Sequence, residues 1–203
     1  MKFESGGPSG FPDSYFLKDS EGNQPLGPSA LESGHDRDDQ ALDAQNFEKL
    51  ERRAKNMLLH QLSRSIKSTK QLRDYLVKRE IPEPVIESAI ERFTEAGLID
   101  DLRFAETFAA SKRSTRGLST SALRRELAAK GIPSSVIDEV LAEYSQEDDL
   151  RTAVKLAEKR IRAMAHLDRE VRQRRLLGFL GRKGFSSSIC LNAIKAAEQS
   201  LNQ

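Results

Sequence analysis

The sequence predicts an all-α protein made of three tandem three-helix repeats, which form an elongated, curved helical array. Charged residues make up 32% of the 203 residues and aromatic residues only 6%, a composition typical of small helical modules with much surface. From Phe47 onward, apolar residues recur at helical spacing. That helical pattern then recurs along the chain, which indicates an array of similar units.

The repeat is clearest between two segments that align without a gap. STKQLRDYLVKREIPEPVIESAIE, beginning at Ser68, aligns with STSALRRELAAKGIPSSVIDEVLA, beginning at Ser119, which gives a period of 51 residues. A third copy, RRLLGFLGRKGFSSSICLNAIK, repeats the apolar positions 53 residues further on. Each copy predicts two helices joined by a tight turn. In the second copy, Ser119 or Thr120 caps a helix ending near Lys130, Gly131 suits a left-handed C-terminal cap, and Pro133 begins the next helix.

One further helix is expected before each copy, over residues 47–65, 101–115 and 147–164. These helices complete three repeats, which we place at residues 46–98, 99–146 and 147–203. Residues 1–45 are rich in Gly, Pro, Ser and Asp and show no apolar period, so we predict a disordered acidic tail. Residues 1–46 carry three Lys or Arg against nine Asp or Glu.

The stretch GLIDDLRFAETFAASKRSTRG, from Gly97 to Gly117, places two adjacent carboxylates before a helix and a basic cluster at its end. Side chains one residue apart on a helix diverge by about 100°, so Asp100 and Asp101 do not form a converging acid pair. Capping of a helix N-terminus explains them better. Phe104 and Phe108, four residues apart, are expected to pack in the core rather than stack on bases.

No catalytic, cofactor or metal site is predicted. The single Cys190 occupies an apolar position of the third copy and is expected to be a small core residue. His35, His60 and His166 lack the spacing of a zinc site, and no Gly-rich phosphate loop follows a strand pattern. The N-terminus shows no signal-peptide run and no segment is long and apolar enough to span a membrane, so we expect a soluble cytoplasmic protein that is not an enzyme.

Positive charge is concentrated at the C-terminal end. The last 53 residues contain 12 Lys or Arg against four Asp or Glu. On the 147–164 helix the bases fall opposite the apolar face, so one face packs while the other presents charge. Such an excess favours an anionic partner, which is either DNA phosphate or an acidic protein surface. The candidate partner-binding residues are Arg113, Arg116, Arg124, Arg125, Arg151, Lys155, Lys159, Arg162, Arg169, Arg172, Arg174, Arg175, Arg182 and Lys183.

These features resemble one known family. The run Gly97-Leu98-Ile99-Asp100-Asp101, followed by Arg103-Phe104-Ala105, Phe108, a basic helix end, Gly117 and Leu123-Arg124-Arg125-Glu126-Leu127, is similar to the RecX family, regulators of the RecA recombinase. The similarity extends from Ala54 to about Ala197. One departure is Gln71, where family members often carry Glu.

The resemblance implies a monomeric, non-enzymatic modulator that binds RecA filaments on single-stranded DNA and inhibits ATP hydrolysis, strand exchange and filament growth, within recombination, DNA repair and the SOS response. The residues alone leave two alternatives open. One is a DNA-binding protein with helix-turn-helix-like units that acts independently of RecA, on single-stranded or double-stranded DNA. The other is a helical scaffold for a different protein client.

Overall fold

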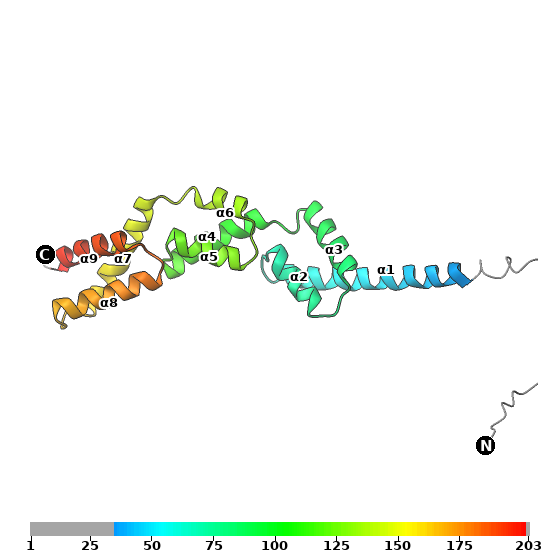
Figure 1. Ribbon diagram of the computed structural model, residues 1–203, viewed down its shortest axis with the longest axis horizontal. Helices are drawn as coiled ribbons and strands as arrows, with labels where there is room; N and C mark the ends of the chain where they lie inside the picture. Colours follow the sequence, from blue (N-terminus) through cyan, green and yellow to red (C-terminus); the bar gives the residue numbers. More distant parts are fainter. Residues whose placement is uncertain (1–34, 202–203) are drawn as a thin grey trace, which may run out of the picture. The chain divides into compact units, whose positions relative to one another are not determined.

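The computed structural model describes residues 35–201, and the contacts divide the chain into two units, residues 1–44 and 45–203. The described residues form nine α-helices and no strand. Figure 1 shows these helices in successive groups of three along the chain. The predicted all-α class and its three three-helix repeats are therefore confirmed.

The helix bounds follow the predicted order. The first repeat contains α1 (His35–Leu62), α2 (Thr69–Val77) and α3 (Glu83–Glu95). The second contains α4 (Asp101–Arg116), α5 (Thr120–Ala129) and α6 (Ser134–Leu141). The third contains α7 (Gln146–Arg162), α8 (Arg169–Arg182) and α9 (Ser187–Leu201).

Helix α1 begins earlier than the sequence pattern predicts. It starts at His35, inside the predicted disordered tail, whose last part is therefore helical. Residues 35–45 lack Gly and Pro, include two Ala, two Gln and one Leu, and carry four Asp near the helix start, where the helix dipole favours negative charge. Residues 1–34 of the predicted tail lie outside the described residues.

Each repeat buries its own hydrophobic core, built from the apolar positions that recur in the sequence. Leu72 and Leu76 of α2 recur as Leu123 and Leu127 of α5 and as Leu176 and Leu180 of α8, and all six are 0–1% exposed. Ile99 belongs to the first core, one residue beyond the predicted end of that repeat. The predicted packing of Phe104 and Phe108 also holds, since both contact the second core and their rings lie 5.7 Å apart.

Polar caps define where the helices begin, largely as the sequence predicts. The Ser119 hydroxyl accepts from the backbone N–H of Ala122 at 3.1 Å, and Asp100 accepts from that of Arg103 at 2.9 Å. Gln71 completes a capping box with Ser68, since its amide oxygen accepts from the Ser68 backbone N–H at 3.1 Å. The departure at Gln71 thus preserves the reciprocal hydrogen bonds, which need only an acceptor at this position.

Adjacent repeats are joined by a polar seam at the N-terminus of the middle helix of the earlier repeat, α2 or α5. We call the contact between the first and second repeats the first seam. There the fully buried Ser68, the N-cap of α2, donates its hydroxyl to the carbonyl of Lys130 at 2.8 Å. Asp101 of α4 accepts from the backbone N–H of Thr69 at 2.8 Å. Asp100 and Asp101 therefore both cap helices, but Asp101 caps the helix of the preceding repeat.

The second seam, between the second and third repeats, repeats this arrangement. Ser119, the N-cap of α5, is fully buried, and its backbone N–H donates to the carbonyl of Lys183 at 3.0 Å. Asp149 of α7 accepts from the backbone N–H of Thr120 at 3.1 Å and from its hydroxyl at 3.1 Å. In both seams the C-terminal end of one middle helix meets the N-terminal end of another, so opposite ends of two helix dipoles adjoin.

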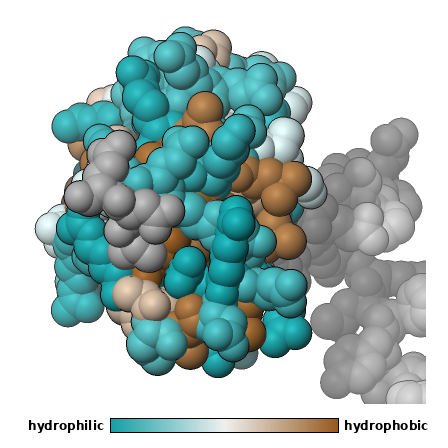
Figure 2. All heavy atoms as spheres, turned by 90° about the vertical axis from the view of Figure 1, so that its left-hand side faces the viewer, coloured by the Kyte–Doolittle hydropathy of each residue, from teal (hydrophilic) through white to brown (hydrophobic). Residues whose placement is uncertain are grey.

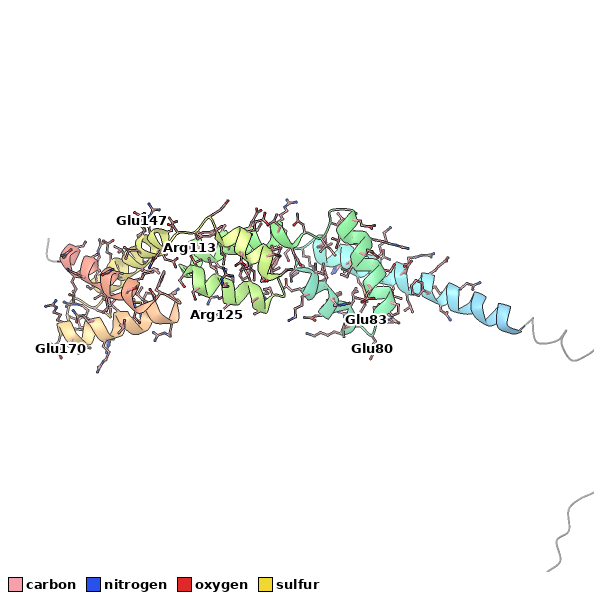
Figure 3. The ribbon with its side chains drawn as sticks, turned by 45° about the horizontal axis from the view of Figure 1, so that its top comes forward. Glu80, Glu83, Arg113, Arg125, Glu147 and Glu170 are labelled. Carbon is pink, nitrogen blue, oxygen red and sulfur yellow. The ribbon has the colours of Figure 1, made fainter. Side chains whose placement is uncertain are left out.

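Glycine is required where a middle helix ends against the preceding repeat. Gly131 and Gly184 have φ of 79° and 88°, and a Cβ on them would lie 2.5 Å from the Lys70 Cβ and 2.6 Å from the Ser119 Oγ, respectively. The same position in the first repeat is Glu80, with φ of 59°. Figure 3 shows Glu80 projecting at the turn between α2 and α3. Glu80 is exposed, so the position bears only the strain of the left-handed backbone and a side chain fits.

Replacing Gly131 should cost more stability than replacing a glycine of similar conformation outside the seam. Gly97 is the control, because it has φ of 66° and a Cβ there would meet no atom within 4 Å. We expect Gly97→Ala to lower the free energy of unfolding by about 1 kcal/mol from backbone strain alone. Gly131→Ala should lower it by roughly 2 kcal/mol or more, because the first seam must also shift. Urea denaturation followed by circular dichroism measures both, and equal losses would contradict the seam contact.

Cys190 should react slowly with thiol reagents in the folded protein. The residue is 1% exposed in the third core, and burial raises the pKa of its thiol. At pH 8 less of it is therefore thiolate, the reactive form, than in a free cysteine. We expect reaction with a disulfide reagent to be at least about 100-fold slower than in urea, because the core must open first. A rate close to that of free cysteine in the native protein would contradict this burial.

Candidate functional site

The predicted basic residues fall into four groups according to their burial and contacts. The first group consists of the partly buried bases Arg113, Arg172 and Lys183, of which Arg113 of α4 lies inside the second seam. Its guanidinium forms an ion pair with Asp149 and donates to the carbonyl of Leu118 at 3.1 Å. The two side chains of the pair are only 13% and 11% exposed. Arg113, which Figure 3 shows on α4 near the start of α7, therefore joins two repeats and presents little charge outward.

Two other predicted bases are also engaged by neighbouring groups. The ammonium of Lys183 donates to the carbonyl of Arg116 across the second seam. Arg172 donates to the carbonyl of Leu167 at 3.0 Å, and its Nε is a buried atom without a hydrogen-bond partner among the described residues. Carbonyl groups of the protein itself thus engage both side chains. The partner-binding role predicted for Arg172 and Lys183 stays a prediction.

The second group consists of exposed bases with a polar partner inside the protein. Arg116 pairs with Glu126 at 3.2 Å, and Arg169 pairs with Glu198 at the same distance. Arg124 pairs with Asp138 at 2.5 Å, and Arg151 forms a pair with Asp148. Arg125 instead donates to the hydroxyl of Ser121 at 2.9 Å. Exposed pairs of this kind contribute about 0–1 kcal/mol, so an external anion could compete for these arginines.

The third group has no ion pair within the described residues and lies in the third repeat. Arg174, Arg175 and Arg182 of α8 are exposed, and they line a groove of about 570 Å³ between α7 and α8. Arg160 of α7 lines the same groove, and its guanidinium lies 5.1 Å from the centre of the Phe179 ring. We call this the third-repeat groove.

The remaining predicted bases, Lys155, Lys159 and Arg162, form the fourth group and are exposed on α7, whose buried face carries Ala157 and Ile161. The predicted division of this helix into a packed face and a basic face is therefore confirmed. Figure 2 views the molecule from the end that carries the third repeat. Hydrophilic residues cover most of that face, and a few hydrophobic side chains appear between them.

A second basic groove lies in the first repeat, where no partner-binding residue is predicted from sequence. Its volume is about 500 Å³ and it lies between α1 and α2, centred on the half-buried ring of Tyr75. Its bases are Lys49, Arg52, Arg53 and Arg79, and His60 also lines it. We call this the first-repeat groove.

The sequence carried a signal for both grooves. Tyr75 lies 104 residues before Phe179, the sum of the two repeat periods, so both rings occupy the same repeat position. The balanced net charge of residues 47–150 concealed the first-repeat groove, whose lining contains no acidic residue. Arg160 belongs to the predicted basic segment but not to the predicted partner-binding set.

No group of three or more His, Cys, Asp or Glu in the described residues could hold a metal ion. Across the same part of the chain, no helix combines the length and apolar character needed to cross a bilayer. The described surface carries two basic grooves, and an aromatic ring lines each of them.

The fold and these surfaces define a class: a helical repeat protein that carries basic grooves. Comparison with known proteins gives the particular family. Models of the first, second and third three-helix domains of RecX match residues 54–93, 100–141 and 146–194, in chain order. The chain belongs to the RecX family.

Relatives and solved structures agree with this assignment. The chain is 40% identical over 144 residues to a regulatory protein RecX of Streptomyces lividans, which covers 71% of this chain and 77% of the relative. It is 36% identical to the regulatory protein RecX of Thermobifida fusca over 148 residues, covering 73% and 80%. A crystal structure of a regulatory protein RecX superimposes with a TM-score of 0.68 at 26% identity, covering 77% of each chain. RecX from Lactobacillus salivarius shows the same fold, with a TM-score of 0.67 at 24% identity, covering 75% of this chain and 99% of that one.

Removing the Asp149 carboxylate should destabilise the protein far more than removing an exposed partner. Asp149→Ala deletes the acceptor for Thr120 and leaves the Arg113 guanidinium nearly buried without its counter-charge. We expect a loss of about 3 kcal/mol in the free energy of unfolding. The matched control is Asp138→Ala, which breaks the exposed pair with Arg124 and should cost less than about 1 kcal/mol. Similar losses in urea denaturation would show that the second seam does not depend on this pair.

Proposed function

We propose that this chain is a non-enzymatic regulator that binds RecA filaments on single-stranded DNA and inhibits RecA ATPase, strand exchange and filament growth. The observation that carries the proposal is the family membership of all three repeats together with the exposed bases of the third repeat that form no ion pair within the described residues. Relatives in the family bear the name regulatory protein RecX. The partner of the regulator is inferred to be the RecA filament.

The architecture supports binding to a long partner. Three separate cores are joined by polar seams, so each repeat presents its own outer surface instead of merging into one core. Arrays built in this way offer extended surfaces to a partner. Contact with several filament subunits at once would restrain the movements that ATP hydrolysis requires.

The grooves and exposed arginines supply the electrostatic attraction. Arg174, Arg175 and Arg182 meet no carboxylate within the described residues, so their charge is available to an anionic partner. Arg124, Arg125, Arg151 and Arg169 can exchange an internal polar contact for an external one. Lys155, Lys159 and Arg162 extend the same surface along α7.

The alternative of a helix-turn-helix-like protein that binds duplex DNA without RecA has less support. In such proteins the second helix of each pair enters the major groove. Here the corresponding helices α3 and α6 are acidic: α3 carries four Glu and one Arg, and α6 carries one Asp, one Glu and no base. Duplex phosphates would repel these helices, whereas the basic grooves lie between the first two helices of a repeat.

The test compares two triple variants in a DNA-stimulated RecA ATPase assay. The first variant combines Arg174→Gln, Arg175→Gln and Arg182→Gln and removes three unpaired charges from the third-repeat groove. The control variant combines Arg73→Gln, Arg92→Gln and Arg103→Gln, which removes the same number of charges from exposed side chains outside both grooves and outside the predicted partner-binding set. We expect the first set to raise the concentration required for inhibition about tenfold or more, because three lost contacts of roughly 0.5–1 kcal/mol each sum to about 1.5–3 kcal/mol. The control set should inhibit nearly as the unmodified chain does.

Two results would contradict different parts of the proposal. If both triple variants inhibit equally, the third-repeat groove is not the contact surface. If the unmodified chain neither alters the ATPase nor sediments with RecA filaments on single-stranded DNA, the proposed function itself is wrong. Sedimentation with the DNA alone serves as the control for binding that does not require RecA.

A further inference from the structure

The two basic grooves occupy the same place in two different repeats. Each lies between the first and second helices of its repeat, α1 and α2 or α7 and α8. Each contains an aromatic ring at the same repeat position, Tyr75 or Phe179, followed four residues later by a base, Arg79 or Lys183. This recurrence makes a chance clustering of charge an insufficient explanation.

Within each groove at least one cation lies over the ring, and the Phe179 ring has a second one, the ammonium of Lys183, 5.6 Å from its centre. The guanidinium of Arg79 is 5.0 Å from the centre of the Tyr75 ring, and the guanidinium of Arg160 is 5.1 Å from that of Phe179. Both rings are half-buried against their cores, and both arginines are exposed. One part of each ring is therefore covered by an exposed arginine side chain and not by tightly packed core residues.

The middle repeat has lost this arrangement. Its residue at the ring position is Glu126, which pairs with Arg116 at 3.2 Å. A carboxylate at the centre of the site repels anions and offers no ring. The repeats therefore alternate between groove, closed position and groove.

We propose that the two grooves bind single-stranded nucleic acid, with an unpaired base stacked on Tyr75 in the first repeat and another on Phe179 in the third. Backbone phosphates of the nucleic acid would contact the surrounding arginine side chains. These include Arg52, Arg53 and Arg79 in the first-repeat groove and Arg174, Arg175 and Arg182 in the third-repeat groove. A basic groove with an accessible aromatic ring is the usual combination for sequence-tolerant single-strand binding.

The contact exchanges one set of interactions for another. As a base approaches, Arg79 or Arg160 leaves the ring face and moves to a phosphate, so a cation–π contact is replaced by a base stack and an ion pair. Duplex DNA cannot use the ring in this way, because its bases are already stacked on one another. An acidic peptide would satisfy the arginines but would leave the ring without a planar partner.

This inference deepens the proposed function and rests on it for the source of the single strand, the DNA within a RecA filament. The contact itself requires no RecA, so the two can be tested separately. The first experiment measures binding of the full chain to an oligodeoxythymidylate by fluorescence anisotropy. An abasic oligonucleotide of the same length serves as the second probe, because it keeps the phosphates and lacks the bases.

The test variant is the double substitution Tyr75→Leu with Phe179→Leu, which keeps apolar side chains against both cores. In single-strand-binding proteins, replacing a stacking aromatic residue by alanine lowers the affinity about fivefold or more per base. The double variant should therefore bind the oligodeoxythymidylate at least about tenfold more weakly than the unmodified chain. Its binding to the abasic probe should match that of the unmodified chain. The control is Phe108→Leu, a half-buried ring with Lys112 5.1 Å from its centre that lines neither groove. It should bind both probes as the unmodified chain does.

A direct readout of stacking is available because the chain contains no Trp. Phe179→Trp places a single tryptophan in the third-repeat groove, and Phe108→Trp provides the matched control in the second repeat. We expect oligodeoxythymidylate to quench the fluorescence of Trp at position 179 but not at 108, and the abasic probe to quench neither. Circular dichroism and urea denaturation establish that each variant is folded before its binding is interpreted.

Several outcomes would overturn the inference. Equal affinity for the intact and abasic probes, or binding without quenching at position 179, would show that the grooves contact phosphate alone. Displacement of the oligonucleotide by polyglutamate at equal charge concentration would favour an acidic protein surface as the occupant. If the chain inhibits RecA but does not bind the oligonucleotide, the inference fails while the proposed function stands; the reverse result would remove the proposed function and keep the grooves.

Discussion

The structure depends on one recurring interaction: a buried helix N-terminus in one repeat that is capped by the next repeat. Ser68 and Ser119 are fully buried, and each lies against the C-terminal carbonyl of the following middle helix. Asp101 and Asp149 reach back from the next repeat to the first N–H group of the capped helix. A buried donor without a partner costs about 1–3 kcal/mol, so a shift of one repeat against its neighbour would leave several buried groups unsatisfied. The seams thus join the repeats through directional polar contacts rather than through a shared core.

Because the cores are apolar and the seams use few basic side chains, much positive charge remains on the surface. Each repeat buries its apolar residues in its own core. Each seam contains only a few polar groups, and Arg113 is the main cation among them. The other bases are free to lie on outer helix faces, where water and salt screen their mutual repulsion. Charge accumulates most in the grooves beside Tyr75 and Phe179, because no acidic residue forms an ion pair with those arginines in the described part of the chain.

The sequence predicted the elements well because their causes are local. The apolar spacing, Ser119, Gly131 and Pro133 each act within a few residues, and the helices and cores formed where these signals placed them. The candidate site was predicted less well because its residues are sorted by contacts between repeats. Nothing adjacent to Arg113 in the sequence distinguishes it from Arg174, yet Asp149, 36 residues away, draws only the former into a seam. The first-repeat groove depends on α1 and α2 lying side by side, which spacing within either helix does not encode.

The glycine position also shows how the array is ended. Gly131 and Gly184 leave room for the preceding repeat, whereas the first repeat carries Glu80 at the same place, in the same left-handed conformation. At the other end, the position equivalent to Ser68 and Ser119 is Arg172, whose long side chain bonds to Leu167 within its own repeat. A fourth repeat would meet a bulky side chain in place of a small one at either end, so the surfaces that join the inner repeats are absent from the outer ones. Repeat arrays require such altered ends to stay soluble and finite, because identical ends would continue to associate.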